Sequence, residues 1–195
     1  MKALTLALLL LTITITGEEA MANNCNEGLM RAQATQEIEY LRRWYAKATD
    51  KIGLADEASV EAGRSIYHRV FAPDATLDAG PDREPQVGPD AWVDLVLSVL
   101  GPMGPTQHLI GTQVVDIKSL VLNDACEVVS GSARMESYVQ AWHELTDENK
   151  VWIYLGTYFD EVEFEPGQGW RIVDMKMEQM AGETRFMGEA VGGAK

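Results

Sequence analysis

The sequence is poor in the side chains that metal and redox chemistry require. Its 195 residues contain only two cysteines and three histidines, and these never approach the spacing of a metal site. No glycine-rich phosphate loop follows a predicted strand, and no nucleophile-elbow motif occurs. We therefore predict neither a metal ion nor a cofactor, and few side chains remain as candidates for chemistry.

Basic residues are also scarce. The chain has 16 lysines and arginines against 30 acidic residues, which gives a formal net charge of −14. The acidic residues are scattered along the chain, and no basic cluster offsets them. Because such a surface repels a phosphate backbone, we expect no nucleic acid partner.

The N-terminal apolar run is short. It extends from Ala3 to Thr16, about 14 residues, against roughly 20 needed to span a bilayer, so we expect no permanent membrane anchor. Lys2 precedes the run and Ala20-Met21-Ala22 follows it, which is typical of a secretory signal peptide over residues 1–22. This pattern predicts export to a periplasm or out of the cell. A start at Met21 is the alternative, and it would give a cytoplasmic protein.

The two cysteines, Cys25 and Cys126, would both remain after removal of residues 1–22. In an oxidising compartment two thiols can pair, and this bond would tie the new N-terminus to a strand about 100 residues later. Two unrelated thiols, with Cys126 buried, are an equally open interpretation, because the spacing alone does not decide between them.

The first half of the chain has helical periodicity. Apolar side chains recur at helical spacing in three segments, and Gly53 and Pro73 end the first two. A short strand and a loop rich in glycine and proline separate the second helix from the third. The predicted helices are Thr35–Ile52, Glu57–Phe71 and Asp90–Leu100, the strand is Ala75–Asp78 and the loop is Gly80–Pro89.

The second half has the alternating pattern of strands. Four long segments are separated by turn residues, which predicts an antiparallel meander after three helices and therefore an α+β domain. A bent sheet wrapped by helices leaves a cavity on its concave side. The predicted strands are Thr106–Leu122, Ala125–His143, Val151–Glu165 and Trp170–Met180. We predict a lead-in over residues 23–34, one domain over 35–182 and a flexible tail over 183–195.

Four segments resemble the SnoaL-like branch (polyketide cyclase and scytalone dehydratase-like) of the nuclear transport factor 2-like superfamily. They lie in the same order as in that family and span about 150 residues: QEIEYLRRWYAKATD (36–50), VFAPDATLD (70–78), TQHLIGT (106–112) and GTYFDEVEFEPGQGWRI (156–172). The resemblance implies a cone-shaped fold, in which three N-terminal helices pack on a strongly curved antiparallel sheet and enclose a pocket.

The resemblance also implies a catalytic pair. Asp50 and His108 match the first-helix aspartate and second-strand histidine of the scytalone dehydratase and lindane dehydrochlorinase members. A carboxylate that accepts the ring N–H of a histidine fixes its tautomer and leaves the other nitrogen as a general base. The helical pattern alone places Asp50 opposite the apolar stripe, as a solvated acid. Asp78, near the position of the base in steroid isomerases of the superfamily, is a second candidate.

The chain departs from scytalone dehydratase where that enzyme polarises its substrate. Thr49 and Ala79 stand at the positions of its two tyrosines, and Val139 lies nearest to its further histidine. Its pocket asparagine falls near Tyr154. Without such donors a developing enolate is unstabilised. The two other histidines of this chain, His68 and His143, are expected to be exposed.

We predict a cofactor-independent lyase or isomerase that acts on a small apolar molecule. A non-catalytic protein that binds such a ligand is the first alternative, and a homo-oligomeric scaffold is the second. A homo-oligomer is expected in each case, because relatives assemble through the sheet. The candidate pocket-lining residues, which would equally suit a plain core, are Tyr45, Tyr67, Trp92, Met103, Tyr138 and Tyr154.

Overall fold

The computed structural model describes residues 25–187, except for the side chain of Asp147. The predicted signal peptide and residues 188–195 of the predicted tail lie outside this range. Three α-helices and one short 3-10 helix accompany a single six-stranded sheet. The helices are α1 (Glu27–Ile52), α2 (Glu57–Val70), α3 (Gly88–Leu100) and η1 (Thr146–Glu148). The strands are β1 (Phe71–Asp78), β2 (Gln86–Val87), β3 (Thr106–Leu122), β4 (Val128–Leu145), β5 (Lys150–Glu165) and β6 (Gly169–Phe186).

Helix α1 is longer than the periodicity predicts. It begins at Glu27, where the Asn26 side chain accepts the backbone N–H of Leu29 as an N-cap. The predicted start of this helix at Thr35 is therefore wrong, because the apolar stripe starts only at Ala34, after the first two turns. No helix among residues 25–187 is long and apolar enough to cross a bilayer.

The meander of β3, β4, β5 and β6 has the predicted antiparallel pairing. The sheet order is β2-β1-β6-β5-β4-β3, and β1 pairs with β6 in parallel. The sheet is therefore mixed, with one parallel pair beside the expected antiparallel meander. The reason is that the chain leaves β1, passes through α3 and returns to the β1 side only with its last strand, which then runs in the direction of β1.

Strand β6 continues further than predicted. It pairs with β5 as far as Phe186, which lies opposite Lys150. The predicted tail is therefore wrong for residues 183–186. The sequence after Gly182 lacks apolar alternation, but β5 presents backbone groups over its whole length, and a free strand edge favours pairing whatever the side chains are.

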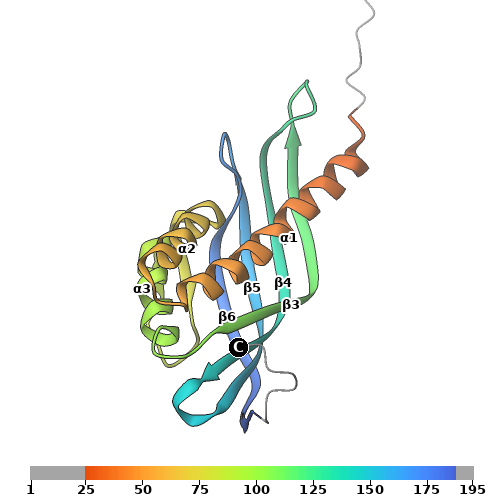
Figure 1. Ribbon diagram of the computed structural model, residues 1–195. Coiled ribbons are helices and arrows are strands. Elements are labelled where there is room, and N and C mark those ends of the chain that lie inside the picture. The colour runs from red at the N-terminus through yellow and green to blue at the C-terminus, as the bar shows by residue number, and fades with distance from the viewer. Residues whose placement is uncertain (1–24, 188–195) are drawn as a thin grey trace, which may run out of the picture.

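The sheet is bent, and the helices lie on its concave side. Shifts in the β3–β4 register, between Gly111 and Gln113 and between Ile117 and Ser119, mark bulges that bend these strands. Figure 1 shows α1 running diagonally across the sheet, with α2 and α3 gathered near its C-terminal end. The core fills the space between these layers, and a cavity remains where α1 ends.

A disulfide bond joins the start of α1 to the hairpin between β3 and β4. Cys25 and Cys126 are bonded, with their Cα atoms 5.5 Å apart. Figure 1 shows the first turn of α1 beside the tip of this hairpin. The sequence left open whether the two cysteines pair, and in the structure they do. The reason is that α1 crosses the whole sheet and brings its N-terminus to the hairpin between β3 and β4.

Candidate active site

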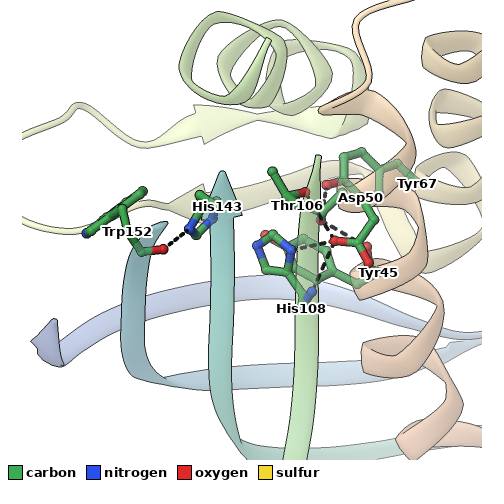
Figure 2. A network of polar contacts seen from close by, with 8 residues as sticks. Tyr45, Asp50, Tyr67, Thr106, His108, His143 and Trp152 are labelled. Carbon is green, nitrogen blue, oxygen red and sulfur yellow. Dashed lines mark hydrogen bonds and ion pairs between the residues drawn. The ribbon is translucent and has the colours of Figure 1, made fainter. Parts of the chain in front are cut away.

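Asp50 and His108 meet at the end of α1. The Asp50 Oδ1 atom lies 2.8 Å from His108 Nδ1 and 3.1 Å from the backbone nitrogen of His108. The same oxygen accepts the Thr106 hydroxyl at 3.3 Å. Figure 2 shows the carboxylate reaching from α1 to the histidine on β3. The Asp50 side chain is 19% exposed and the His108 side chain 7%, so the pair is largely withdrawn from solvent.

Asp50 faces the sheet because α1 has a second buried stripe. Arg42 and Ala46 are buried at four-residue spacing, and Asp50 continues this row at the helix end, where α1 packs against β3. The helical wheel, drawn on the apolar stripe alone, placed Asp50 in solvent. That expectation is wrong, because a helix lying across a curved sheet is covered on more than one side.

The hydrogen bonds fix the tautomer of His108. A carboxylate only accepts hydrogen bonds, so the short contact with Asp50 Oδ1 requires a proton on Nδ1 of the ring. The neutral ring then carries its lone pair on Nε2. His108 lines the cavity, and an imidazole with this tautomer is arranged to act as a general base.

A second histidine, His143, lies beside this pair. It is only 3% exposed, so the expectation of an exposed side chain is wrong. Its ring stands edge-on to the His108 ring, with centroids 5.3 Å apart, and stacks on Trp152 at 4.4 Å. Burial and, next, the neighbouring His108 lower the pKa of His143 to about 4, so this ring is neutral at physiological pH.

The β4 pattern contained the signal for His143. Alternate residues Val139, Ala141 and His143 are all buried on the concave face. The turn beside Glu144 suggested exposure, but β4 extends to Leu145 and keeps His143 inside the sheet. The cavity therefore has a second histidine on β4 after all, and it lies past Val139 along the strand.

Cross-strand register arranges the floor of the cavity in rows. His108 pairs with Ala141, and Ala141 pairs with Tyr154, so these three side chains form one row across β3, β4 and β5. In the next row His143 stands between Thr106 and Trp152. Because Ala141 has the smallest side chain of its row, open space remains between the histidine and the tyrosine.

The cavity has a volume of about 780 Å³, which is in the range of pockets for small organic ligands. Helix α3 supplies an aliphatic wall, and the sheet supplies aromatic rings. The loop after β1 and the middle of β6 form a charged rim. Apart from the row already described, the main wall residues are Leu95, Val96, Val99, Trp152 and Tyr158, none of which the sequence reasoning selected.

Three of the six candidate pocket residues line the cavity: Tyr45, Trp92 and Tyr154. The other three do not. Tyr67 is fully buried one layer behind, stacked on Tyr45 and 2.6 Å from the Thr49 hydroxyl. Met103 packs against the core from outside the cavity wall. Tyr138 is 52% exposed, because strand alternation turns it to the outer face.

Tyr154 is a neutral hydrogen-bond donor in this wall. Burial, and then the nearby Tyr45, raise its pKa to about 12. Its ring extends over Gly156, where an added Cβ would come within 2.7 Å of the Tyr154 hydroxyl oxygen. A glycine at this position therefore lets the phenol ring of Tyr154 lie along the strand.

A buried ion pair supports the aromatic wall from behind. Arg42 Nε donates to Asp160 Oδ2 at 3.2 Å, and both side chains are fully buried. The guanidinium lies 4.4 Å from the centroid of the Tyr45 ring and 3.9 Å from that of Tyr158. These contacts hold the two rings in place.

The remaining candidates have structural contacts. Asp78 lines the rim, where its carboxylate accepts the backbone N–H of Gly80 at 2.8 Å and shapes the loop. His68 is on the surface, as expected, and contacts Asp90 at 3.1 Å. Among residues 25–187 no cluster of three or more potential ligands could hold a metal ion.

The SnoaL-like domain family matches residues 53–176, which is more than half of the chain. The chain belongs to this family. The matched part of this SnoaL-like protein includes His108 and His143 but begins just after Asp50. A search of curated proteins finds no match.

Solved structures confirm the fold of this SnoaL-like protein. A putative scytalone dehydratase from Novosphingobium aromaticivorans is 19% identical, with a TM-score of 0.62, over 86% of this chain and 99% of that one. The hexachlorocyclohexane dehydrochlorinase LinA-type3 from Novosphingobium barchaimii is 15% identical, with a TM-score of 0.64, over 85% and 99%. A nuclear transport factor 2-like superfamily protein from Salmonella enterica is 13% identical, with a TM-score of 0.54, over 85% and 99%. The predicted α+β class and the nuclear transport factor 2-like fold are therefore confirmed.

Proposed function

We propose that this SnoaL-like protein is a cofactor-independent lyase or isomerase. In this proposal His108 removes a proton from a carbon of a small, mainly apolar substrate, and Asp50 holds and orients its ring. The 2.8 Å contact between Asp50 Oδ1 and His108 Nδ1, at the wall of a large cavity, is the observation that carries the proposal.

The surroundings of the dyad suit a base. When His108 Nε2 takes the proton, the ring becomes an imidazolium, and the Asp50 carboxylate beside Nδ1 stabilises the new charge. The carboxylate also accepts the backbone N–H of His108. The ring is therefore held in one orientation before the reaction, which lowers the cost of reaching the reacting geometry.

Tyr154 is the proposed electrophilic group. It lies two strands from His108 in the same row, which corresponds to roughly 10 Å between backbones at the usual strand spacing. A substrate lying over Ala141 would contact both residues. The phenol O–H would donate to the oxygen on which negative charge develops. Tyr154 would thus polarise the substrate, which two tyrosines do in scytalone dehydratase at the positions of Thr49 and Ala79.

The names of two structural neighbours support elimination chemistry. One is a putative dehydratase and the other a dehydrochlorinase, and both names describe removal of a small molecule from a substrate. At 19% and 15% identity these neighbours support the class of reaction in our proposal, while the substrate is left to experiment.

Proton removal is testable without the natural substrate. Phenylacetone in D2O, followed by NMR, reports base-catalysed exchange of its activated C–H hydrogens. We expect the protein to accelerate this exchange, and His108→Ala and Asp50→Asn each to lose about 100-fold or more of the acceleration, with melting temperatures within a few degrees of the wild type.

Two surface or rim substitutions serve as controls. Asp78→Asn tests the second candidate base, and His68→Ala removes a histidine outside the cavity. Both should keep the exchange rate. Wild-type exchange in His108→Ala, or a loss confined to Asp78→Asn, would rule out the dyad as the base.

A ligand-binding protein is the second candidate function. It is favoured by the family match, which begins after Asp50 and so leaves half of the dyad outside the shared region. In that case bound ligands would raise the melting temperature with concentration. The dyad substitutions would then change affinity, and no exchange above background would occur in any variant.

A further inference from the structure

The proposed reaction leaves His143 without a role. This ring is buried, lines the cavity and stands 5.3 Å from the His108 ring, centroid to centroid. Figure 2 shows the two histidines side by side on β4 and β3, and of these two rings the Asp50 carboxylate contacts only that of His108. A polar ring in this place, apart from the dyad, points to a separate task.

The contacts of His143 fix its tautomer. Its Nδ1 atom lies 3.3 Å from the backbone oxygen of Trp152. A carbonyl oxygen only accepts, so Nδ1 carries the proton. Stacking on the Trp152 indole holds the ring in this orientation. Because the ring is neutral, its Nε2 atom has a free lone pair and is a hydrogen-bond acceptor.

Among residues 25–187, the one hydrogen bond of the His143 ring is made by Nδ1, so no side chain there donates to Nε2. The charged and titratable groups that face this ring are His108 on β3 and Asp50 on α1. Neither has a proton for it, because His108 donates from Nδ1 to Asp50. Because His143 lines the cavity, a ligand that brings a hydrogen-bond donor could reach this free acceptor.

We propose that His143 is a specificity residue that accepts a hydrogen bond from a hydroxyl group of the substrate. The substrate class is then an apolar molecule with a hydroxyl group close to the C–H bond that His108 attacks. This deepens the proposed function and rests on it for the position of the reacting carbon. Ligands without a donor, such as halogenated hydrocarbons, would leave the acceptor unsatisfied and bind less well.

Matched pairs of ligands isolate the hydroxyl contact. The probes are 2-naphthol with 2-methoxynaphthalene, and phenol with anisole, which differ in the donor hydrogen. Calorimetric titration of the full-length protein gives the ratio of the two dissociation constants within each pair. We expect wild type to favour the hydroxyl compound, and His143→Phe to reduce that preference about tenfold.

His143→Gln is the conservative control, because its amide oxygen replaces the Nε2 acceptor, and it should keep most of the preference. His143→Leu repeats the test with a different apolar side chain. An unchanged ratio in both His143→Phe and His143→Leu, or a wild-type protein that favours neither hydroxyl compound, would overturn the proposal.

The two proposals fail separately. An unchanged ligand ratio together with lost exchange in His108→Ala would remove the role of His143 and keep the dyad. A ratio that depends on His143 together with normal exchange in His108→Ala would keep the hydroxyl contact and remove the base.

Discussion

Oδ1 of Asp50 accepts hydrogen bonds from the ring and the backbone of His108 and from the Thr106 hydroxyl. One carboxylate oxygen thus joins the end of α1 to β3 and orients the candidate base. His143 obtains its orientation from Trp152 in the neighbouring row. At the scale of single residues, the site therefore consists of two histidines that are held by different elements and carry the same tautomer.

Ala141 separates the candidate base from the candidate donor, and its small size keeps the cavity open. We expect Ala141→Leu to fill the space between His108 and Tyr154. Proton exchange and ligand binding should fall at least about tenfold, while the dyad contact stays intact. The added carbons enter an existing cavity, so the destabilisation should be at the low end of the overpacking range, about 1 kcal/mol.

Gln140→Leu is the matched control, because it adds an apolar side chain at the neighbouring position, on the opposite face of β4. NMR exchange and urea denaturation of both variants make the comparison. If Ala141→Leu exchanged and bound ligands like the wild type, the substrate would not lie over this residue.

At the scale of elements, α1 has a different task at each end. Its first turn follows the disulfide-bonded Cys25, and its last turn carries Asp50. These ends are 25 residues apart, which is roughly 37 Å along a helix at 1.5 Å per residue. The bond should therefore stabilise the fold without acting on the site.

Removal of the disulfide bond tests this division. The bond closes a loop with a sequence separation of 101 residues, and the chain-entropy relation gives about 4–5 kcal/mol as its upper contribution. We expect the double variant Cys25→Ser/Cys126→Ser to lose a few kcal/mol in urea denaturation and to keep the exchange rate of the folded protein. An equal free energy of unfolding in both proteins would contradict this expectation.

At the scale of the whole molecule, buried polar groups make stability depend on pH. His143 has a folded pKa of about 4 against an ordinary value of 6.5, so the unfolded chain binds a proton in this range and the folded chain does not. The contribution of neutral His143 to the free energy of unfolding is therefore complete above pH 6.5 and is lost as the pH falls toward 4. His108, Asp50 and the Trp152 carbonyl are the groups that act on this titration.

We expect the wild type to lose about 1–2 kcal/mol of stability from this group between pH 7 and pH 4.5, less than the full shift implies because the ring borders a cavity. His143→Gln has no titrating ring, so its loss over the same range should be smaller by that amount. Urea denaturation at the two pH values measures both. Parallel losses in the two proteins would assign the acid sensitivity to carboxylates instead.

Sequence reasoning succeeded for the antiparallel meander of the four long strands and failed for the pairing of β1 and for the faces and ends of some elements. The strand pattern predicted both ends of β3, Thr106 and Leu122, correctly. The family resemblance predicted that Asp50 and His108 form a pair. Tyr138 and His143 were assigned to the wrong faces, because the local pattern does not show which face of β4 turns toward the helices. Export and self-association remain predictions from the sequence.

The sequence by itself determined the α+β class, the order of the three helices and of every strand except β2, and the scarcity of groups for metal or nucleic acid binding, because these follow from local periodicity and composition. Only the tertiary structure decided which side chains share the cavity. The pairing of β3, β4 and β5 set Ala141 between His108 and Tyr154, and the path of α1 over a bent sheet brought Asp50 to β3. Such contacts join residues that are far apart in the chain, so no local pattern contains them.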